Sequence, residues 1–161
     1  MHEPFRRVRP PLVRQTSNMS CWAAALVSWL GVCCPRARLD ETAIADAFRR
    51  WQTPDGRIEL PGLQAIAEAF TMGADEVPGA NLTPEYLAAK LRFGHLYLTY
   101  TPGPAPDIGH TVVVYTVGPV VVDLMDPFVG YTSQPFAFFT SRRRAFVAWP
   151  RYGGGVVPLP E

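Results

Sequence analysis

The sequence predicts an α+β domain in which helices come first and strands follow. In the first half of the 161-residue chain, apolar residues recur at helical spacing. From about residue 95 onward the chain changes to short runs rich in Val, Thr and Tyr, which favour strands. Helix-rich and strand-rich segments that are separated along a chain are typical of the α+β class. The chain is 48% hydrophobic, so it can bury the core of a single domain.

The predicted helices follow an N-terminal arm. Residues 1–19 are expected to be extended, because Pro10 and Pro11 oppose a helix there, and the single domain would span 20–161. Ser20 or Asn18 can cap the first helix. Caps, prolines in the first turn and apolar faces predict four helices, at residues 20–32, 40–51, 61–70 and 83–93.

The predicted strands begin after the fourth helix. A loop rich in proline and glycine at residues 101–109 separates the first two strands, and Gly118-Pro119 separates the second from the third. Residues 133–140 are expected to form a short helix. The predicted strands are residues 95–101, 110–117, 120–125 and 144–149.

Charge and cysteine content exclude several classes of function. The net charge of +1 gives no basic footprint for nucleic acid. Cys21, Cys33 and Cys34 have neither the spacing of a disulfide framework nor that of a zinc site, so we expect no metal or other cofactor. The sequence contains no run of about 18 apolar residues, so we predict no membrane span. The arm has no Sec signal, so we expect a cytoplasmic protein or one delivered into another cell by a specialised secretion system.

Cys21 is the candidate nucleophile. It stands where a polar loop enters the first helix, and the helix dipole and unpaired N–H groups there favour a thiolate. Gln15, six residues earlier, could direct its amide N–H groups to the same point. Cys33 and Cys34 lie near the other end of the helix, where we expect them to pack as small apolar residues.

His110 and Asp126 are the candidate partners of the thiol. A turn centred on Gly118 would pair His110 with Asp126 across a hairpin, with both side chains on one face. Asp123 would then pair with Val113 and point to the other face. The remaining candidates are expected to be structural or exposed: His2, His95 and Asp107.

The whole set of residues resembles the papain-like cysteine proteases. The resemblance rests on Gln15, on Cys21-Trp22 opening an alanine-rich helix, on Gly109-His110 and on Asp126-Pro127. It is closest to short bacterial members, namely bacteriocin leader peptidases and effector proteases of plant pathogens. These resemble the chain in its short length and in its aspartate where papain itself has asparagine. The resemblance implies a helical half carrying the cysteine, a sheet half carrying His and Asp, and a cleft between them.

The predicted function is therefore that of a cysteine endopeptidase. Cys21, His110 and Asp126 would form the catalytic triad, and Gln15 would donate to the oxyanion. Trp22 could shield the His–Asp pair or fill the core. Residues 60–62, 93–95 and 101–109 are expected to flank the substrate groove. The expected partners are a protein or peptide substrate and, for an effector or toxin, an inhibitor or immunity protein.

Two other functions use the same sequence features. A glutamine deamidase or acyl-transfer toxin would form the same thioester from a side-chain amide. A non-catalytic papain-like module would keep the fold for binding alone.

Overall fold

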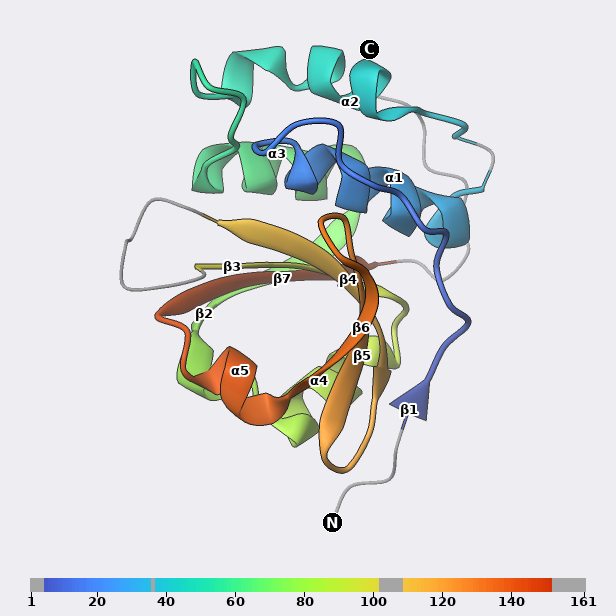
Figure 1. Ribbon diagram of the computed structural model, residues 1–161, viewed down its shortest axis with the longest axis vertical. Coiled ribbons are helices and arrows are strands. Elements are labelled where there is room, and N and C mark those ends of the chain that lie inside the picture. The colour runs from blue at the N-terminus through green and yellow to red at the C-terminus, as the bar shows by residue number, and fades with distance from the viewer. Residues whose placement is uncertain (1–4, 36, 102–108, 152–161) are drawn as a thin grey trace.

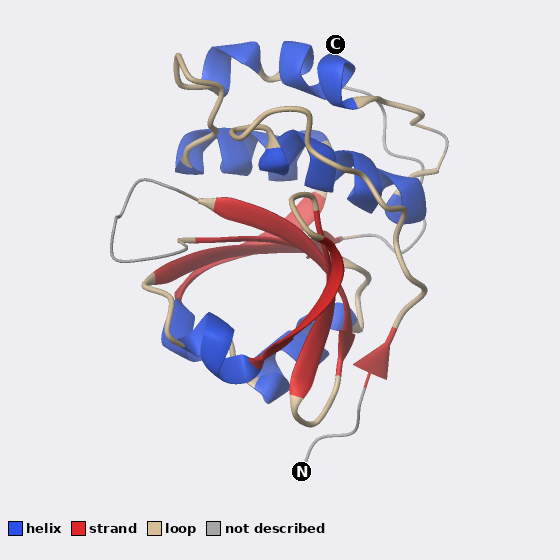
Figure 2. Cartoon of the chain, in the orientation of Figure 1, coloured by secondary structure: helices blue, strands red, loops and turns tan. Residues whose placement is uncertain are grey.

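The computed structural model describes residues 5–35, 37–101 and 109–151, and there the chain forms one antiparallel sheet between two groups of helices (Figures 1 and 2). Two helices cover one face of the sheet, at the top of Figure 1: α1 (Cys21–Cys33) and α3 (Leu60–Ala69). A third, α2 (Glu41–Ala47), packs on their outer side. Two helices lie on the opposite side: α4 (Pro84–Leu91) and α5 (Phe136–Thr140). The α+β class predicted from the sequence is confirmed.

The sheet has seven strands, in the order β2-β7-β3-β4-β5-β6, with β1 paired to β4. The bounds of the strands are β1 (Phe5–Arg6), β2 (Met72–Pro78), β3 (Leu96–Tyr100), β4 (His110–Val117), β5 (Val121–Asp126), β6 (Gly130–Pro135) and β7 (Arg144–Pro150). All of the strand pairs are antiparallel. β3 and β4 lie in the middle, and almost every one of their residues is buried because both faces of the sheet are covered.

Local signals explain where the helices begin. The side chain of Asp40 accepts a hydrogen bond from Ala43 N at the start of α2, and that of Thr83 accepts one from Tyr86 N at the start of α4. The helix predicted over residues 40–51 is interrupted at Phe48, and a 3₁₀ turn, η1 (Arg49–Trp51), follows it. A second 3₁₀ turn, η2 (Gly79–Asn81), precedes α4.

The expected order of helices first and strands after is wrong in one place. β2 lies between α3 and α4 and forms the edge of the sheet by pairing with β7. β6 was also not predicted; it covers residues 133–135, so the short helix expected at 133–140 begins only at Phe136. Neither strand is rich in β-branched residues, and pairing with a neighbouring strand determines both.

Each face of the sheet has its own hydrophobic core. The core under α1, α2 and α3 includes Trp22, Leu26, Trp29, Ile66, Tyr97 and Val113. The core on the side of α4 and α5 includes Leu87, Leu91, Leu98, Val112, Val114 and Phe139. Full burial of such a side chain contributes roughly 1.5–3 kcal/mol. The first of these cores holds α1 against the centre of the sheet, and any site between α1 and the sheet depends on that packing.

The described part of the N-terminal arm runs along both halves of the molecule (Figure 1). Its first residues form β1 against β4, and Arg7 donates to the carbonyl groups of Leu91 and Arg92. Further along, Gln15 N donates to Pro127 O at 3.0 Å. The arm therefore places Gln15 beside the end of β5. The boundary proposed at residue 20 stays a prediction.

Candidate active site

The candidate site lies where three elements begin or end. Cys21 is the first residue of α1, His110 the first of β4 and Asp126 the last of β5. Together with Gln15 from the arm, these three residues line one cavity of about 550 Å³, here called the main cavity. The structure thus brings together all four residues that the sequence analysis selected.

Cys21 combines burial with access to the main cavity. It is only 6% exposed, and its Sγ lies 3.9 Å from Gly109 O. Ser20, the residue before the helix, does not cap it: the Ser20 hydroxyl bonds to Ser17 instead. Because no side chain caps α1 at this position, the partial positive charge of its first turn stays next to the thiol.

His110 and Asp126 form a hydrogen-bonded ion pair. His110 Nε2 lies 2.7 Å from Asp126 Oδ1, and Phe128 N also donates to Oδ1, at 2.8 Å. Burial acts to lower the pKa of His110, but hydrogen bonds to Asp126 and Cys21 outweigh it and raise the pKa to about 9. Burial likewise opposes ionisation of Asp126, yet the bonds from His110 and from backbone N–H groups hold its pKa below the usual value. Both effects favour imidazolium facing carboxylate.

The hairpin register differs from the one predicted. The turn beside Gly118 has two central residues, and the pairing shifts at a bulge between Val114 and Thr116. As a result, Asp123 pairs with Thr116 rather than with Val113. His110 reaches Asp126 diagonally, because the neighbouring pairs are Val113 with Met125 and Val114 with Leu124.

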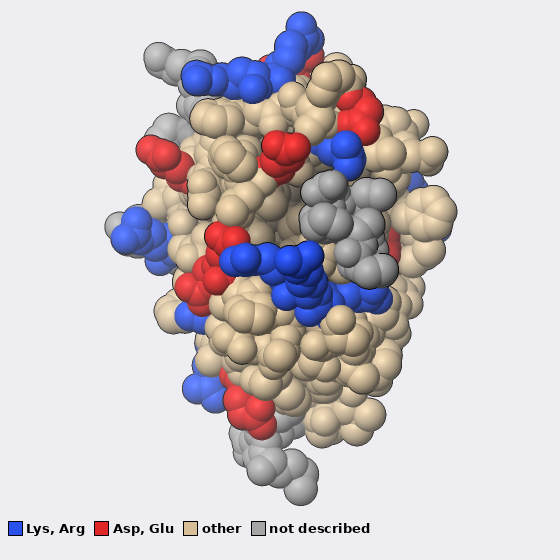
Figure 3. All heavy atoms as spheres, turned by 90° about the vertical axis from the view of Figure 1, so that its left-hand side faces the viewer, with Lys and Arg blue, Asp and Glu red and all other residues tan. Residues whose placement is uncertain are grey.

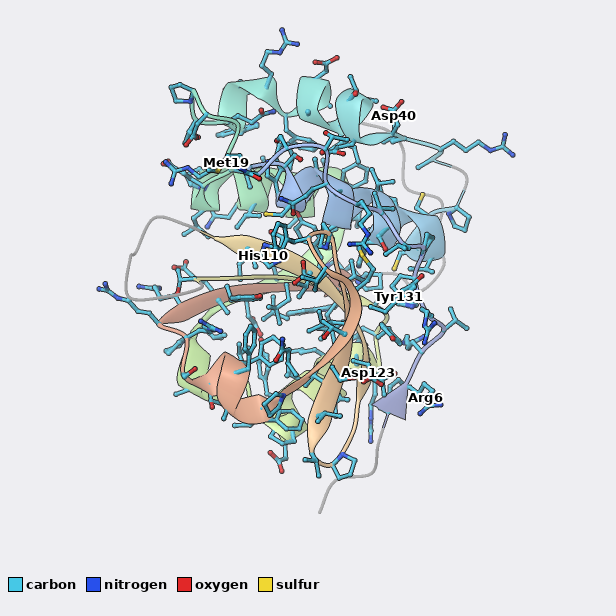
Figure 4. All side chains as sticks on the ribbon, in the orientation of Figure 1. Arg6, Met19, Asp40, His110, Asp123 and Tyr131 are labelled. Atoms are coloured by element: carbon cyan, nitrogen blue, oxygen red, sulfur yellow. The ribbon has the colours of Figure 1, made fainter. Side chains whose placement is uncertain are left out.

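Asp123 lies away from the site, as Figure 4 shows: His110 is next to the helical layer and Asp123 is near the opposite end of the sheet. The carboxylate of Asp123 accepts a hydrogen bond from the Ser133 hydroxyl of the neighbouring strand. Its surroundings are those of a structural residue on the sheet surface.

Gln15 is anchored near the thiol by both its backbone and its side chain. Its Nε2 donates to Ser17 O at 2.8 Å, while its Oε1 is buried without a hydrogen-bond partner among the described residues. A side-chain amide has two N–H donors. With one held by Ser17, the second remains to serve a group bound in the main cavity.

The other residues weighed from the sequence have different places. Trp22 is 2% exposed, belongs to the core under α1, and donates its indole N–H to Gly56 O. It also lines the main cavity beside His110 and Asp126, and shielding of that pair stays a prediction. His95 is buried below α1, with Nε2 2.6 Å from Val8 O, and is structural. His2 and Asp107 lie outside the described residues.

A second cavity, of about 490 Å³, adjoins the main one. The two share four lining residues: Ile58, Thr99, Tyr100 and Gly109. Of the segments expected to flank a groove, Leu60, Pro61, Thr101 and Gly109 line the second cavity. Residues 102–108 of the expected segment 101–109 lie outside the described residues. The expectation for residues 93–95 is wrong, because Phe93 stacks on Trp149 and His95 contacts the arm.

Sequence reasoning missed several residues of the main cavity. Tyr100, Phe138 and Arg142 line it on the side of the sheet, with the Arg142 guanidinium 4.0 Å from the centre of the Phe138 ring. Only the position of Tyr100, opposite His110 in a β3–β4 pair, could have been inferred from the predicted strands. Arg144 lines the second cavity, and Figure 3 shows basic side chains gathered beside a hollow on this face.

The described residues show neither a metal centre nor a membrane-spanning helix. Within residues 5–35, 37–101 and 109–151, no three His, Cys, Asp or Glu side chains are grouped as metal ligands. No helix in those ranges is both long and apolar enough to cross a bilayer. The groups that line the main cavity are a thiol, an imidazole held by a carboxylate, and an amide donor.

Comparison with known proteins places the fold. No family model matches the chain, and no curated protein matches it in sequence. Among solved structures, the peptidase domain of Streptococcus ComA, a bi-functional ABC transporter of a quorum-sensing pathway, aligns with a TM-score of 0.61 at 17% identity, over 88% of this chain and 99% of that one.

Two further structures align equally well. A double-glycine-motif protease of an AMS/PCAT transporter, solved in complex with the leader peptide, has a TM-score of 0.61 at 17% identity, over 93% and 99% of the two chains. A protein of Bacillus anthracis described as a C39-like peptidase has a TM-score of 0.61 at 13% identity, over 94% and 100%. The chain therefore has the papain-like fold of the C39 peptidase domains.

Proposed function

We propose that this protein is a cysteine peptidase that hydrolyses a peptide bond through Cys21, His110 and Asp126. The observation that carries the proposal is the main cavity, which joins the thiol to an imidazole whose other side is held 2.7 Å from a carboxylate. A nucleophile, a base and a group that orients the base are the parts that thiol hydrolysis requires. The fold shared with peptidase domains supports the same function.

The mechanism follows from the roles of these groups. His110 holds the proton of the Cys21–His110 pair as imidazolium, and the Cys21 thiolate attacks the carbonyl carbon of the scissile bond. The backbone N–H of Cys21 and the free N–H of Gln15 stabilise the oxyanion. His110 then protonates the leaving amine, and a thioester remains on Cys21. Water, deprotonated by His110, hydrolyses that thioester and restores the thiol.

The proposed substrate is a peptide in extended conformation. The two adjoining cavities share Ile58, Thr99, Tyr100 and Gly109 as lining residues, so they form one continuous surface beside Gly109. One structural neighbour was solved with a leader peptide, which makes peptides with a double-glycine motif the first to test. Delivery into another cell as an effector or toxin, with an inhibitor or immunity protein as partner, is a further proposal that rests on the sequence resemblance.

One experiment separates the proposed function from its rivals. A peptide library from a digested proteome, supplemented with double-glycine leader peptides, is incubated with wild-type protein or with Cys21→Ala and analysed by mass spectrometry. New termini that appear only with the wild type support a peptidase. Deamidated or amine-linked glutamine without new termini would indicate a deamidase or acyltransferase. No difference between the two proteins would leave a binding module.

Gln15→Ala is expected to lower kcat by roughly 100- to 1000-fold while KM changes little, because an oxyanion donor acts mainly in the transition state. Steady-state kinetics on a cleaved peptide measures this. Ser17→Ala is a suitable control, since Ser17 holds Gln15 through a backbone carbonyl that the substitution keeps. A rise in KM alone would place Gln15 in ordinary substrate binding.

The alkaline limit of activity is expected near pH 9 rather than near 6.5. The leaving amine needs a protonated His110, and the pKa of His110 is raised to about 9 by its bonds to Asp126 and Cys21. Activity should therefore persist below that pH and fall as pH rises through it. Asp126→Asn, which removes the negative charge, should move the limit downward. A profile of kcat against pH that falls near 6.5 in the wild type would contradict the pairing.

A further inference from the structure

Tyr100 contacts the imidazole of His110 directly. It is the last residue of β3 and pairs with His110, the first residue of β4, across the antiparallel ladder. Their ring centroids are 5.7 Å apart, with an interplanar angle of 75°, which is an edge-to-face contact. The imidazole therefore has a neighbour other than its hydrogen-bond partners.

Tyr100 is itself held firmly. The ring makes edge-to-face contacts with Phe138, at 5.4 Å, and Phe139, at 6.0 Å, and the guanidinium of Arg142 lies 5.4 Å from its centre. The residue is only 5% exposed. Burial and the nearby carboxylate of Asp126 raise the pKa of Tyr100, so its hydroxyl stays neutral beside the ion pair. The ring is thus a rigid wall and not a charged partner.

A rigid neighbouring ring restricts the motion of the imidazole that its hydrogen bonds still allow. The bond from Nε2 to Asp126 fixes one atom of the imidazole, but moderate tilt of the ring plane weakens that bond without breaking it. Tilt would change the distance between the opposite nitrogen and the thiol. Proton transfer between imidazole and thiol depends on that distance, and displacement by about 1 Å can cost 100-fold in rate.

We propose that Tyr100 is a positioning residue that holds the plane of the His110 imidazole, through contact of the two rings, in the orientation that serves Asp126 and Cys21 together. This inference rests on the proposed triad. It assigns the role to the aromatic ring of Tyr100 and not to its hydroxyl, and it gives α5 a part in the site, since Phe138 and Phe139 support that ring.

The test compares Tyr100→Phe, which keeps the ring, with Tyr100→Leu, which removes it. Tyr115→Leu is the matched control. Tyr115 is also a buried tyrosine of this sheet, but it lies on β4 five residues after His110. Two quantities are measured for each folded variant: kcat and KM on a cleaved peptide, and the midpoint of the His110 proton resonance titrated by NMR. With three histidines in the chain, loss of one signal in His110→Gln assigns it.

Tyr100→Leu is expected to lower kcat by about 10- to 100-fold with little change in KM, and to move the His110 midpoint from near 9 towards 6.5, since a tilted ring bonds Asp126 less well. Tyr100→Phe should match the wild type in both, and Tyr115→Leu should lose thermal stability only. A normal kcat and midpoint in Tyr100→Leu would overturn the proposal. So would a defect in Tyr100→Phe as large as that in Tyr100→Leu.

Two further measurements keep the outcome decisive. If Tyr100→Leu does not fold, Phe138→Leu removes one of the rings that support Tyr100 and should shift kcat and the midpoint in the same direction by less; no shift would overturn the proposal. If the wild type cleaves no peptide, the proposed function fails, but the NMR midpoint still reports whether Tyr100 holds His110 against Asp126.

Discussion

Cys21→Ala is expected to abolish peptide cleavage while leaving the fold intact. Loss of the nucleophile removes the covalent route entirely, and in a triad enzyme this costs on the order of 10⁶-fold in kcat. The fold should survive because alanine fits a helical first turn and because Cys21 forms no disulfide: all three cysteines are free. The measurement pairs a cleavage assay with circular dichroism and a thermal melt.

The two other cysteines are the controls for Cys21. Burial raises the pKa of the Cys33 thiol to about 12, so Cys33 stays protonated and unreactive at neutral pH. Cys34 is 5% exposed and packs in the core under α1. Cys33→Ala and Cys34→Ala should therefore keep full activity and lose stability at most. Normal turnover by Cys21→Ala would contradict the proposed mechanism as a whole.

The parts of the fold that could be predicted are those with local signals. Asp40 and Thr83 are helix caps whose side chains accept the expected backbone hydrogen bonds, and both helices begin where predicted. β2 and β6 have no such signal: their sequences, MGADEVP and GYTSQP, contain few β-branched residues. They are strands because β7 and β5 present open edges to them, which is a property of the folded sheet and not of the segments.

The site residues also divide into those that local sequence signals predict and those that depend on the folded sheet. The position of Cys21 at a helix start and that of His110 at a strand start can be inferred from short stretches of sequence. The approach of Asp126 to His110 was inferred from a register that is wrong in detail. A two-residue turn and the bulge near Tyr115 change the pairing, yet both side chains remain on one face, so the contact forms diagonally. The cavities are lined by residues of α5, of the loop between η1 and α3, and of β3. No local sequence pattern indicates that these three segments lie together.

Asp126→Ala is expected to reduce kcat by about 10³- to 10⁴-fold, the scale found when the orienting carboxylate of a triad is lost. Two effects combine: the imidazole loses its partner at 2.7 Å, and His110 loses the bond that favours its protonated form. The matched control is Asp123→Ala on the same strand, whose carboxylate bonds only to Ser133 among the described residues. That variant should lose some stability and keep its activity.

Asp126→Asn separates orientation from charge. Asp126 also accepts a hydrogen bond from Phe128 N, so alanine would release the backbone after β5 as well as the imidazole. Asparagine can keep one acceptor oxygen for these donors but carries no negative charge. We therefore expect Asp126→Asn to retain more activity than Asp126→Ala at pH 6 and to lose that advantage as pH rises, because its imidazolium is no longer held by an opposite charge. Equal activity of Asp126→Asn and Asp126→Ala at every pH would show that the carboxylate acts through its charge alone. An inactive Asp123→Ala together with an active Asp126→Ala would mean that the His110–Asp126 pair has no part in catalysis.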